Sequence, residues 1–156
     1  MAQTLIAVVG AGVAEAEGMA QAEVVGQLIA SQGWVLICGG LGGVMAAACR
    51  GGKLAGGQTI GILPGPDPNA ANPWVDIAIA TGLGEARNTI IAQAAAGLIA
   101  VGGEFGTLSE IAFALKLGKP VIGLGTWQLY RQNKLDRTIQ VAQDAEMAVA
   151  LLKALV

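Results

Sequence analysis

The sequence predicts one α/β domain in which helices cover both faces of a mostly parallel sheet, giving three α/β/α layers. Three observations lead to this fold class. Short apolar runs of strand length alternate along the chain with longer segments of helical period. Glycines cluster where the apolar runs end, as turns between strands and helices require. The chain has 156 residues, which is enough for one hydrophobic core and too few for two.

Each element is predicted from its pattern, and the sheet should contain about six or seven strands. Gly33 and Gly118 stand where two helices should end, and the prolines of residues 64–73 indicate a loop. No linker or repeat interrupts the chain, so residues 1–156 are predicted to form a single domain that binds a phosphorylated ligand. The predicted strands are 5–9, 34–38, 59–63, 75–79, 98–101 and 121–124, and the predicted helices are 19–31, 44–53, 85–96, 107–117 and 144–155.

The composition predicts a homo-oligomer. Hydrophobic residues make up 54% of the chain and charged residues 13%, whereas ordinary domains have roughly 45–50% and about 25%. A lone small domain cannot hide this much apolar area, so a second subunit should cover part of it, in a homodimer or homotetramer. A membrane span is not expected, because Gln93 and Gly97 interrupt the longest apolar stretch. The apolar run near the N-terminus has no preceding Lys or Arg, so we expect a cytoplasmic protein.

Charge and residue usage exclude several functions. The net charge is −2 and the nine cations are scattered, so nucleic acid is not an expected partner. The chain has no histidine, which removes histidine general bases and nearly all zinc catalysis. Cys38 and Cys49 match no metal spacing and are expected to be reduced and buried. We therefore expect no protein-ligated metal.

The first glycine turn contains Gly10 and Gly12 and follows a predicted strand. Glu15 stands where the third glycine of a dinucleotide fingerprint belongs, and Cys38 ends the second strand in place of an acid that would hold a ribose. The turn is therefore interpreted as a tight exit from a strand, and NAD is not an expected cofactor.

The second glycine turn, residues 38–45, joins a buried strand to a helix. Glycines at such a turn allow the backbone to approach a ligand, and the helix dipole favours an anion. A close crossing of the helix over the sheet is the alternative explanation. Because glycines fill four of five consecutive positions, ligand approach is favoured, and Gly39, Gly40, Gly42 and Gly43 are the candidate residues.

The third glycine turn, residues 101–110, again lies between a strand and a helix. Thr107 is predicted at or near the helix N-cap, where its hydroxyl can serve helix amides or a phosphate oxygen. Thr107 and Glu110 also have the spacing of a capping box, which would give both a purely structural role. These two interpretations remain open at this point.

Arg87 opens the helix that follows the glycine-containing loop 81–84. It is one of few cations near the end of a predicted strand and is placed to clamp a phosphate. A surface ion pair is the alternative role. In an open parallel sheet, ligands bind beyond the carboxyl ends of the strands, and all these turns are predicted at that edge. Their convergence predicts a pocket for a phosphorylated small molecule. The alternative is that the glycine turns only allow close packing and bind no ligand.

Residues 38–45 resemble the G-G-G-x-x-G-x-M turn of the lonely-guy-type phosphoribohydrolases, once misnamed lysine decarboxylases, with Cys38 in place of the first glycine. Residues 101–110 resemble their P-G-G-x-G-T-x-x-E signature, and Arg87 stands where the group has an essential arginine. Residues 106–120 are more similar to a related branch that contains the molybdenum-cofactor carrier proteins. The resemblance implies a Rossmann-like fold, a dimer or larger oligomer, and a phosphate pocket at the glycine turns.

Two departures from the hydrolase pattern bear on function. Glu104 replaces a signature glycine, and Asn88 stands where the hydrolases usually carry Lys. Both changes favour a binding or carrier protein for the molybdenum cofactor or a nucleotide. The alternative is a nucleoside 5′-monophosphate phosphoribohydrolase, in which Arg87 and Glu110 would act on the N-glycosidic bond. The predicted ligand-binding residues are Gly39, Gly40, Gly42, Gly43, Met45, Arg87, Asn88, Gly102, Gly103, Gly106, Thr107 and Glu110.

Overall fold

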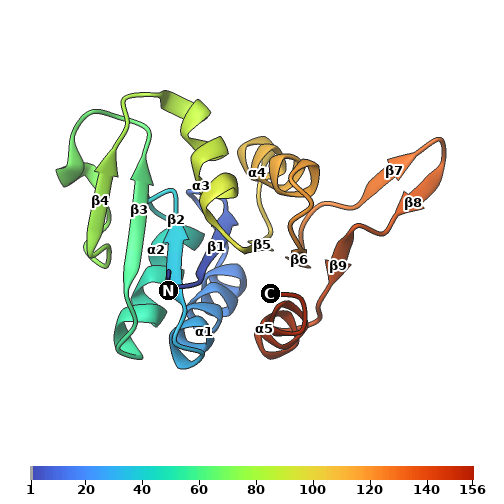
Figure 1. The fold of residues 1–156 in the computed structure, drawn as a ribbon, viewed down its shortest axis with the longest axis horizontal. Coiled ribbons are helices and arrows are strands. Elements are labelled where there is room, and N and C mark those ends of the chain that lie inside the picture. The colour runs from blue at the N-terminus through green and yellow to red at the C-terminus, as the bar shows by residue number, and fades with distance from the viewer. Residues whose placement is uncertain (1) are drawn as a thin grey trace.

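The computed structural model describes residues 2–156 and is built around one parallel sheet. The sheet contains β1 (Leu5–Gly10), β2 (Val35–Cys38), β3 (Thr59–Leu63), β4 (Ile77–Ala80), β5 (Gly97–Val101), β6 (Val121–Leu124) and β9 (Ile139–Val141). The strand order is β4-β3-β2-β1-β5-β6-β9, and every neighbouring pair is parallel (Figure 1). The predicted fold class and the predicted number of strands are confirmed.

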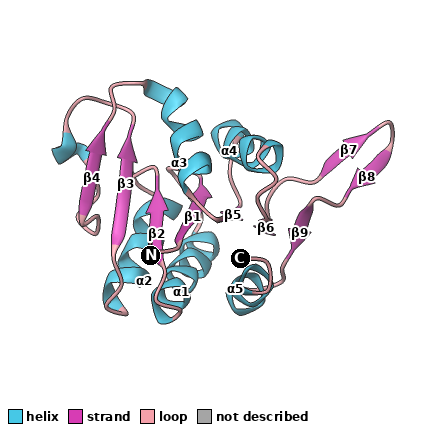
Figure 2. Cartoon of the chain, viewed as in Figure 1, coloured by secondary structure: helices cyan, strands magenta, loops and turns pink. Residues whose placement is uncertain are grey.

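Five α-helices cover the two faces of the sheet (Figure 2). They are α1 (Ala16–Ser31), α2 (Val44–Leu54), α3 (Asn88–Ala94), α4 (Phe105–Lys116) and α5 (Ala145–Lys153). Alternate residues of β1 separate the two layers, as the two-residue period of a strand requires. Ile6 and Val8 pack in the cluster that contains residues of α1, α2 and α5, whereas Ala7 and Val9 pack in the cluster with α3 and α4. Among residues 2–156, no helix has the length and apolar character needed to cross a membrane.

Two adjacent strands outside the main sheet were not predicted. β7 (Leu129–Arg131) and β8 (Lys134–Asp136) form an antiparallel hairpin, and β9 then returns the chain to the edge of the sheet beside β6. Gln132 and Asn133 form the turn with φ of 51° and 62°. Strands of three residues carry too little periodicity to be recognised, and Gln-Asn lacks the glycine that usually marks such a turn.

Several predicted boundaries were wrong. The predicted helix 85–96 is a 3-10 turn, η2 (Gly84–Arg87), followed by the shorter α3. The strand predicted at 75–79 begins at Ile77, and the preceding Asp76 accepts hydrogen bonds with its carboxylate from the amide and hydroxyl of Thr59. The loop 64–73 includes a second 3-10 turn, η1 (Pro68–Ala70), in which Asp67 accepts from the Asn69 amide. Helix α1 begins three residues before its predicted start, at Ala16.

Small residues at the crossing of α1 and α2 explain part of the high glycine content. A Cβ on Gly26 would lie 2.0 Å from the Ala48 carbonyl oxygen, and a Cβ on Gly51 would lie 1.9 Å from that of Glu23. The two helices therefore meet backbone to backbone. This contact fixes α2 against α1 and so helps to set the position of the turn before α2.

Candidate functional site

A cavity of about 520 Å³ lies at the carboxyl ends of the central strands. The loop after β1, the turn after β2, η2 with the start of α3, and the start of α4 form its walls. This is the edge at which open parallel sheets bind ligands. Six of the predicted ligand-binding residues line the cavity, namely Met45, Arg87, Asn88, Gly106, Thr107 and Glu110.

Arg87 is buried and holds the ends of two strands together. Its Nε donates to the Ile62 carbonyl oxygen in β3 at 2.9 Å, and its Nη2 donates to the Gly39 carbonyl oxygen after β2 at 3.5 Å. Its Nη1 lies 3.6 Å from a carboxylate oxygen of Glu85 and also donates to the side-chain oxygen of Asn88. The predicted surface ion pair is therefore only part of its role. The guanidinium is fixed from behind by the backbone and faces the cavity as its only lining cation among the described residues.

Glu110 is a buried carboxyl that has no hydrogen-bond partner among residues 2–156, with 7% of its surface exposed. Burial raises its pKa to about 8, although the Arg87 guanidinium acts in the opposite direction. A carboxyl with this pKa is mostly protonated at neutral pH. No buried polar side-chain atom in the described chain is both enclosed and unpaired, so the Glu110 oxygens keep access to the cavity. Glu110 thus presents a neutral group that can both donate and accept a hydrogen bond.

Thr107 lies one helical turn from Glu110 on the same face of α4. It is the third residue of the helix, because Glu104 is the N-cap and α4 begins at Phe105. Thr107 therefore lies near the N-cap, as predicted, but is not the N-cap itself, so it cannot form the proposed capping box with Glu110. Thr107 is buried and lines the cavity, and its hydroxyl has no hydrogen-bond partner within the described residues. Two buried polar groups of α4 are thus available to a ligand.

Asn88 connects Arg87 to the start of α4. Its amide nitrogen donates to the Ser109 hydroxyl at 3.1 Å and to the Gly106 carbonyl oxygen at 3.4 Å, while its oxygen accepts from Arg87. A lysine at this position could not accept a hydrogen bond from the guanidinium. Asn88 therefore positions the other site residues, and its direct contact with a ligand stays a prediction.

Comparison with known proteins identifies the family of the chain. Residues 3–151 match the model of the SLOG cluster4 family. The chain belongs to this family. A protein from Archaeoglobus fulgidus is 51% identical over 119 residues, which are 76% of this chain and 78% of that protein.

Two solved structures are similar to this SLOG protein over almost its whole length. The molybdenum cofactor binding protein from the phototrophic bacterium Rippkaea orientalis superposes with a TM-score of 0.89 and is 42% identical, covering 99% of this chain and 98% of that chain. The Moco carrier protein of Chlamydomonas reinhardtii has a TM-score of 0.84 and 40% identity, with the same coverage. The predicted resemblance to the molybdenum-cofactor carrier branch is confirmed.

The glycines of the second glycine turn, residues 38–45, are packed closely against neighbouring segments of the chain. A Cβ on Gly39 would lie 2.8 Å from both Arg87 Nη2 and Met45 Sδ, and one on Gly40 would lie 2.8 Å from Leu63. A Cβ on Gly43 would lie 2.2 Å from the Ala11 carbonyl oxygen. These contacts give most of the glycines a packing role, which was the alternative explanation for this turn. Ligand contact by Gly39, Gly40, Gly42 and Gly43 stays a prediction.

Gly102 and Gly103 line an adjoining hollow of about 510 Å³, and both have positive φ, at 54° and 104°. A Cβ on Gly103 would lie 2.5 Å from the Thr107 hydroxyl oxygen. The two cavities share Ala11, Val13 and Glu104 in their walls. Together they form a space with two compartments in front of the N-terminus of α4, which suits a ligand with two chemically different ends.

The loop after β1 is the part of the site that the sequence interpretation missed. Gly10, Ala11 and Gly12 line the cavity, although this turn was expected to be only a strand exit. The strand-exit interpretation does hold for Gly10, because a Cβ there would lie 2.6 Å from the Val101 carbonyl oxygen. Leu41 and Glu85 are further lining residues that the sequence interpretation did not select, since Leu41 is the apolar residue within the second glycine turn and Glu85 lies two residues before Arg87.

The rim of the site is acidic. Glu15 and Glu17 at the start of α1 line the adjoining hollow, and Glu104 lines both cavities. All three side chains are exposed, and none forms an ion pair within residues 2–156. Glu104 replaces a glycine of the hydrolase signature, and its exposed position lets the carboxylate turn into solvent.

The two cysteines are buried and unbonded, with their sulfur atoms 3.4 Å apart. The hydrogen bond with the Cys38 sulfur and then burial raise the pKa of Cys49, which therefore stays a thiol. Among residues 2–156 no group of His, Cys, Asp or Glu has the arrangement of a metal site.

Proposed function

We propose that this SLOG protein binds the molybdenum cofactor and carries it without changing it. The main observation in support is that three buried polar side chains, Arg87, Thr107 and Glu110, line one cavity in the described chain. Thr107 and Glu110 have no hydrogen-bond partner there and line the cavity, so both groups are available to a ligand. The two carrier-type structures support the choice of ligand.

The chemistry of the site fits a ligand with a phosphate at one end and a pterin at the other. The first amides of α4 belong to Phe105, Gly106 and Thr107, and they lie at the positive end of a 12-residue helix. A phosphate at this end would receive these amides and the Thr107 hydroxyl. Arg87, which lines the same cavity, would balance part of its charge. The space of two adjoining cavities leaves room for the ring system beyond the phosphate.

A neutral Glu110 suits this ligand better than a carboxylate would. A pterin ring presents both donors and acceptors along its edge, and a protonated carboxyl can pair with both. Protonation also removes a negative charge that would repel the phosphate. The raised pKa of about 8 thus serves binding directly.

The phosphoribohydrolase remains the alternative function, and we infer that the protein is not an enzyme. Hydrolysis would need Glu110 to act as a carboxylate that stabilises a sugar cation or positions water. A carboxyl that is protonated at neutral pH is poorly suited to that role. Asn88 in place of Lys also leaves the site with one cation, which is already paired with Glu85 at 3.6 Å.

We also infer that the protein works as a homo-oligomer in the cytoplasm. Exposed apolar side chains occur on β4 at Ile77 and Ile79 and again on the far side of the sheet at Val141 and Met147. Such residues on opposite edges fit the apolar surplus of the composition and give a second subunit something to cover. The two closely spaced free thiols fit a reducing compartment.

A ligand comparison tests the proposed function. Thermal shifts should be measured with molybdenum cofactor, AMP and inorganic phosphate, because a ligand that binds only the native state raises stability. The largest shift is expected with the cofactor, and adenine release from AMP should stay at background. Thr107→Val is the matched variant, since it keeps the shape and removes the hydroxyl. A protein that releases adenine, and loses that activity in Glu110→Gln, would be a hydrolase.

A further inference from the structure

The β7–β8 hairpin, with the segment that leads into β9, projects away from the layered body (Figure 1). We call residues 127–138 the arm. Its two strands pair only with each other, and Tyr130 has 64% of its surface exposed. A hairpin of three-residue strands has marginal stability in water by itself. Its position therefore indicates a surface that another molecule covers.

The arm is basic, whereas the rest of the protein is acidic. Arg131, Lys134 and Arg137 are three of the nine cations of the chain and fall within seven residues. None of them forms an ion pair within the described residues. The exposed carboxylates at the rim, Glu15 and Glu17, have no cation partner there either. Unpaired charges of opposite sign on two separate surfaces are complementary between copies of the chain.

The arm begins beside the rim of its own cavity. The Trp127 indole nitrogen donates to the Glu104 carbonyl oxygen at 3.2 Å, and the Trp127 ring lies 5.3 Å from the Phe105 ring. Five residues of extended chain then carry it about 17 Å to the turn at Gln132. Each arm starts at one rim and ends away from it, so a two-fold axis placed beside the arm would carry each tip to the other copy's rim.

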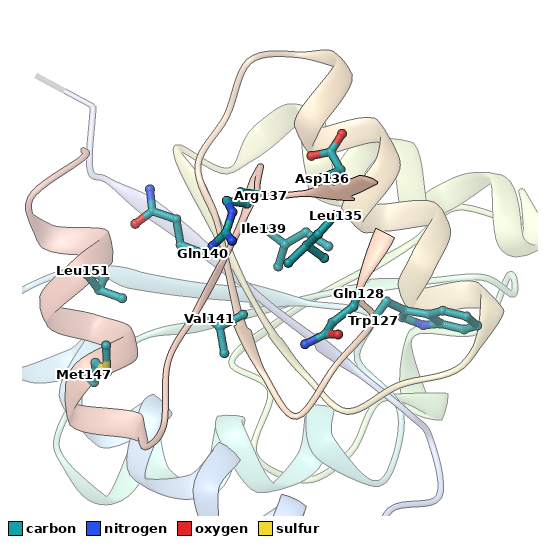
Figure 3. Close-up of a pocket in the computed structure, with 10 residues that line it drawn as sticks. All are labelled: Trp127, Gln128, Leu135, Asp136, Arg137, Ile139, Gln140, Val141, Met147 and Leu151. Atoms are coloured by element: carbon teal, nitrogen blue, oxygen red, sulfur yellow. The ribbon is translucent and has the colours of Figure 1, made fainter. Parts of the chain in front are cut away.

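Apolar side chains accompany the charges on both surfaces. Val13 at the rim is 93% exposed and Phe105 is 75% exposed. Leu135 of the arm is exposed and lines a groove of about 390 Å³ beneath it. Figure 3 shows this groove, with Met147 and Leu151 of α5 on one side and Trp127 on the other. The surface around the arm thus combines an apolar centre with a charged border, as specific interfaces do.

We propose that the arm of a second copy of this chain docks on the acidic rim, so that each copy closes the ligand cavity of the other. The partner's arm brings basic side chains to a rim that carries acidic ones. This places positive charge near a cavity whose own wall supplies only Arg87 among the described residues. The statement about ligand closure rests on the proposed function, whereas the docking of the arm does not.

Charge reversal tests the docking without any ligand. The variants are R131E/K134E on the arm, E15K/E17K on the rim, and the combination of all four substitutions. Sedimentation equilibrium should show an oligomer for the wild type and dissociation constants raised about tenfold or more in each double variant, since like charges then meet. The combined variant should regain assembly. K116E/K153E, which reverses two exposed cations outside the arm, should assemble as the wild type does. A monomeric wild type, or an arm variant that assembles normally, would overturn the proposal.

Cross-linking locates the contact. Lys134→Cys and Glu17→Cys proteins are mixed and treated with a short bis-maleimide, while the buried Cys38 and Cys49 stay unreactive. A cross-linked dimer is expected from this mixture and not from Lys116→Cys mixed with Glu17→Cys. Absence of the dimer in the first mixture would refute docking at the rim. If the arm cross-links as expected but cofactor is not retained, the proposed function fails and the interface stands.

Discussion

Replacing Glu110 by glutamine should stabilise the protein in a manner that depends on pH. The carboxyl has an ordinary pKa of 4.5 in the unfolded chain and about 8 in the folded one. Between these values the unfolded state ionises while the folded state keeps its proton, so folding stability falls as pH rises. Below the lower value both states are protonated, and the burial of the neutral group carries no ionisation cost.

The magnitude follows from the two pKa values. Each pKa unit corresponds to about 1.4 kcal/mol, so the loss between the ordinary pKa and neutral pH is at most roughly 3 kcal/mol. Glu110→Gln keeps the shape and cannot ionise. At pH 7 it should therefore exceed the wild type by up to ~3 kcal/mol in unfolding free energy, and the two proteins should converge only below the ordinary pKa of 4.5.

Urea denaturation from about pH 4 to pH 8 measures this difference, because the range then spans the ordinary pKa of 4.5. The exposed Glu146→Gln serves as the matched control and should follow the wild-type curve. Parallel stability curves for wild type and Glu110→Gln across this range would show that the carboxyl is not held protonated. The argument for a neutral hydrogen-bonding group in the site would then be refuted.

Three further predictions concern the site and its scaffold. Gly43→Ala should lose at least ~2 kcal/mol of unfolding free energy, because Gly43 has a φ of 61° and a Cβ there would meet a carbonyl oxygen at 2.2 Å. The control is Gly18→Ala in α1, where nothing lies within 4 Å of the added Cβ, and it should gain ~0.5 kcal/mol. Asp144→Ala should lose ~1 kcal/mol, because its carboxylate caps α5 by accepting a backbone amide at 2.7 Å, and Asp144→Asn should retain most of that. Arg87→Lys keeps the charge but removes the guanidinium, which donates hydrogen bonds to the carbonyl oxygens of Ile62 and Gly39 at the ends of two strands. Cofactor affinity measured by calorimetry should therefore fall about tenfold. Equal affinity of Arg87→Lys and wild type would remove Arg87 from the binding site.

The sequence predicted the sheet because its central strands are buried on both faces and read as continuous apolar runs. The same signal fails at the edges. β9 is three residues long and contains Gln140, so it shows no such run, whereas the apolar β4 at the other edge was predicted with a start two residues too early. The arm escaped prediction because its strands are exposed and its turn at Gln132 carries no glycine.

The candidate site was predicted in part, because its polar side chains are easier to assign from the sequence than its glycines. Arg87, Thr107 and Glu110 are polar side chains at strand and helix ends, where sequence position determines which edge of the sheet they reach. Glycines are less informative, because a glycine can allow the close approach either of a ligand or of a neighbouring backbone segment. Gly43 faces the loop after β1, and only three-dimensional packing reveals that contact. The lining by Leu41 and Ala11 likewise depends on how two turns meet.

Retention of intact cofactor tests the central claim most directly. The protein should be incubated with molybdenum cofactor at micromolar concentration, passed through a desalting column, and assayed for molybdenum and pterin. The proposal predicts that both stay with the wild type in equal amounts, that both are reduced in Thr107→Val, and that the released cofactor activates a molybdenum enzyme lacking it. Failure of the wild type to retain either component, or release of a cleaved pterin, would contradict a carrier function.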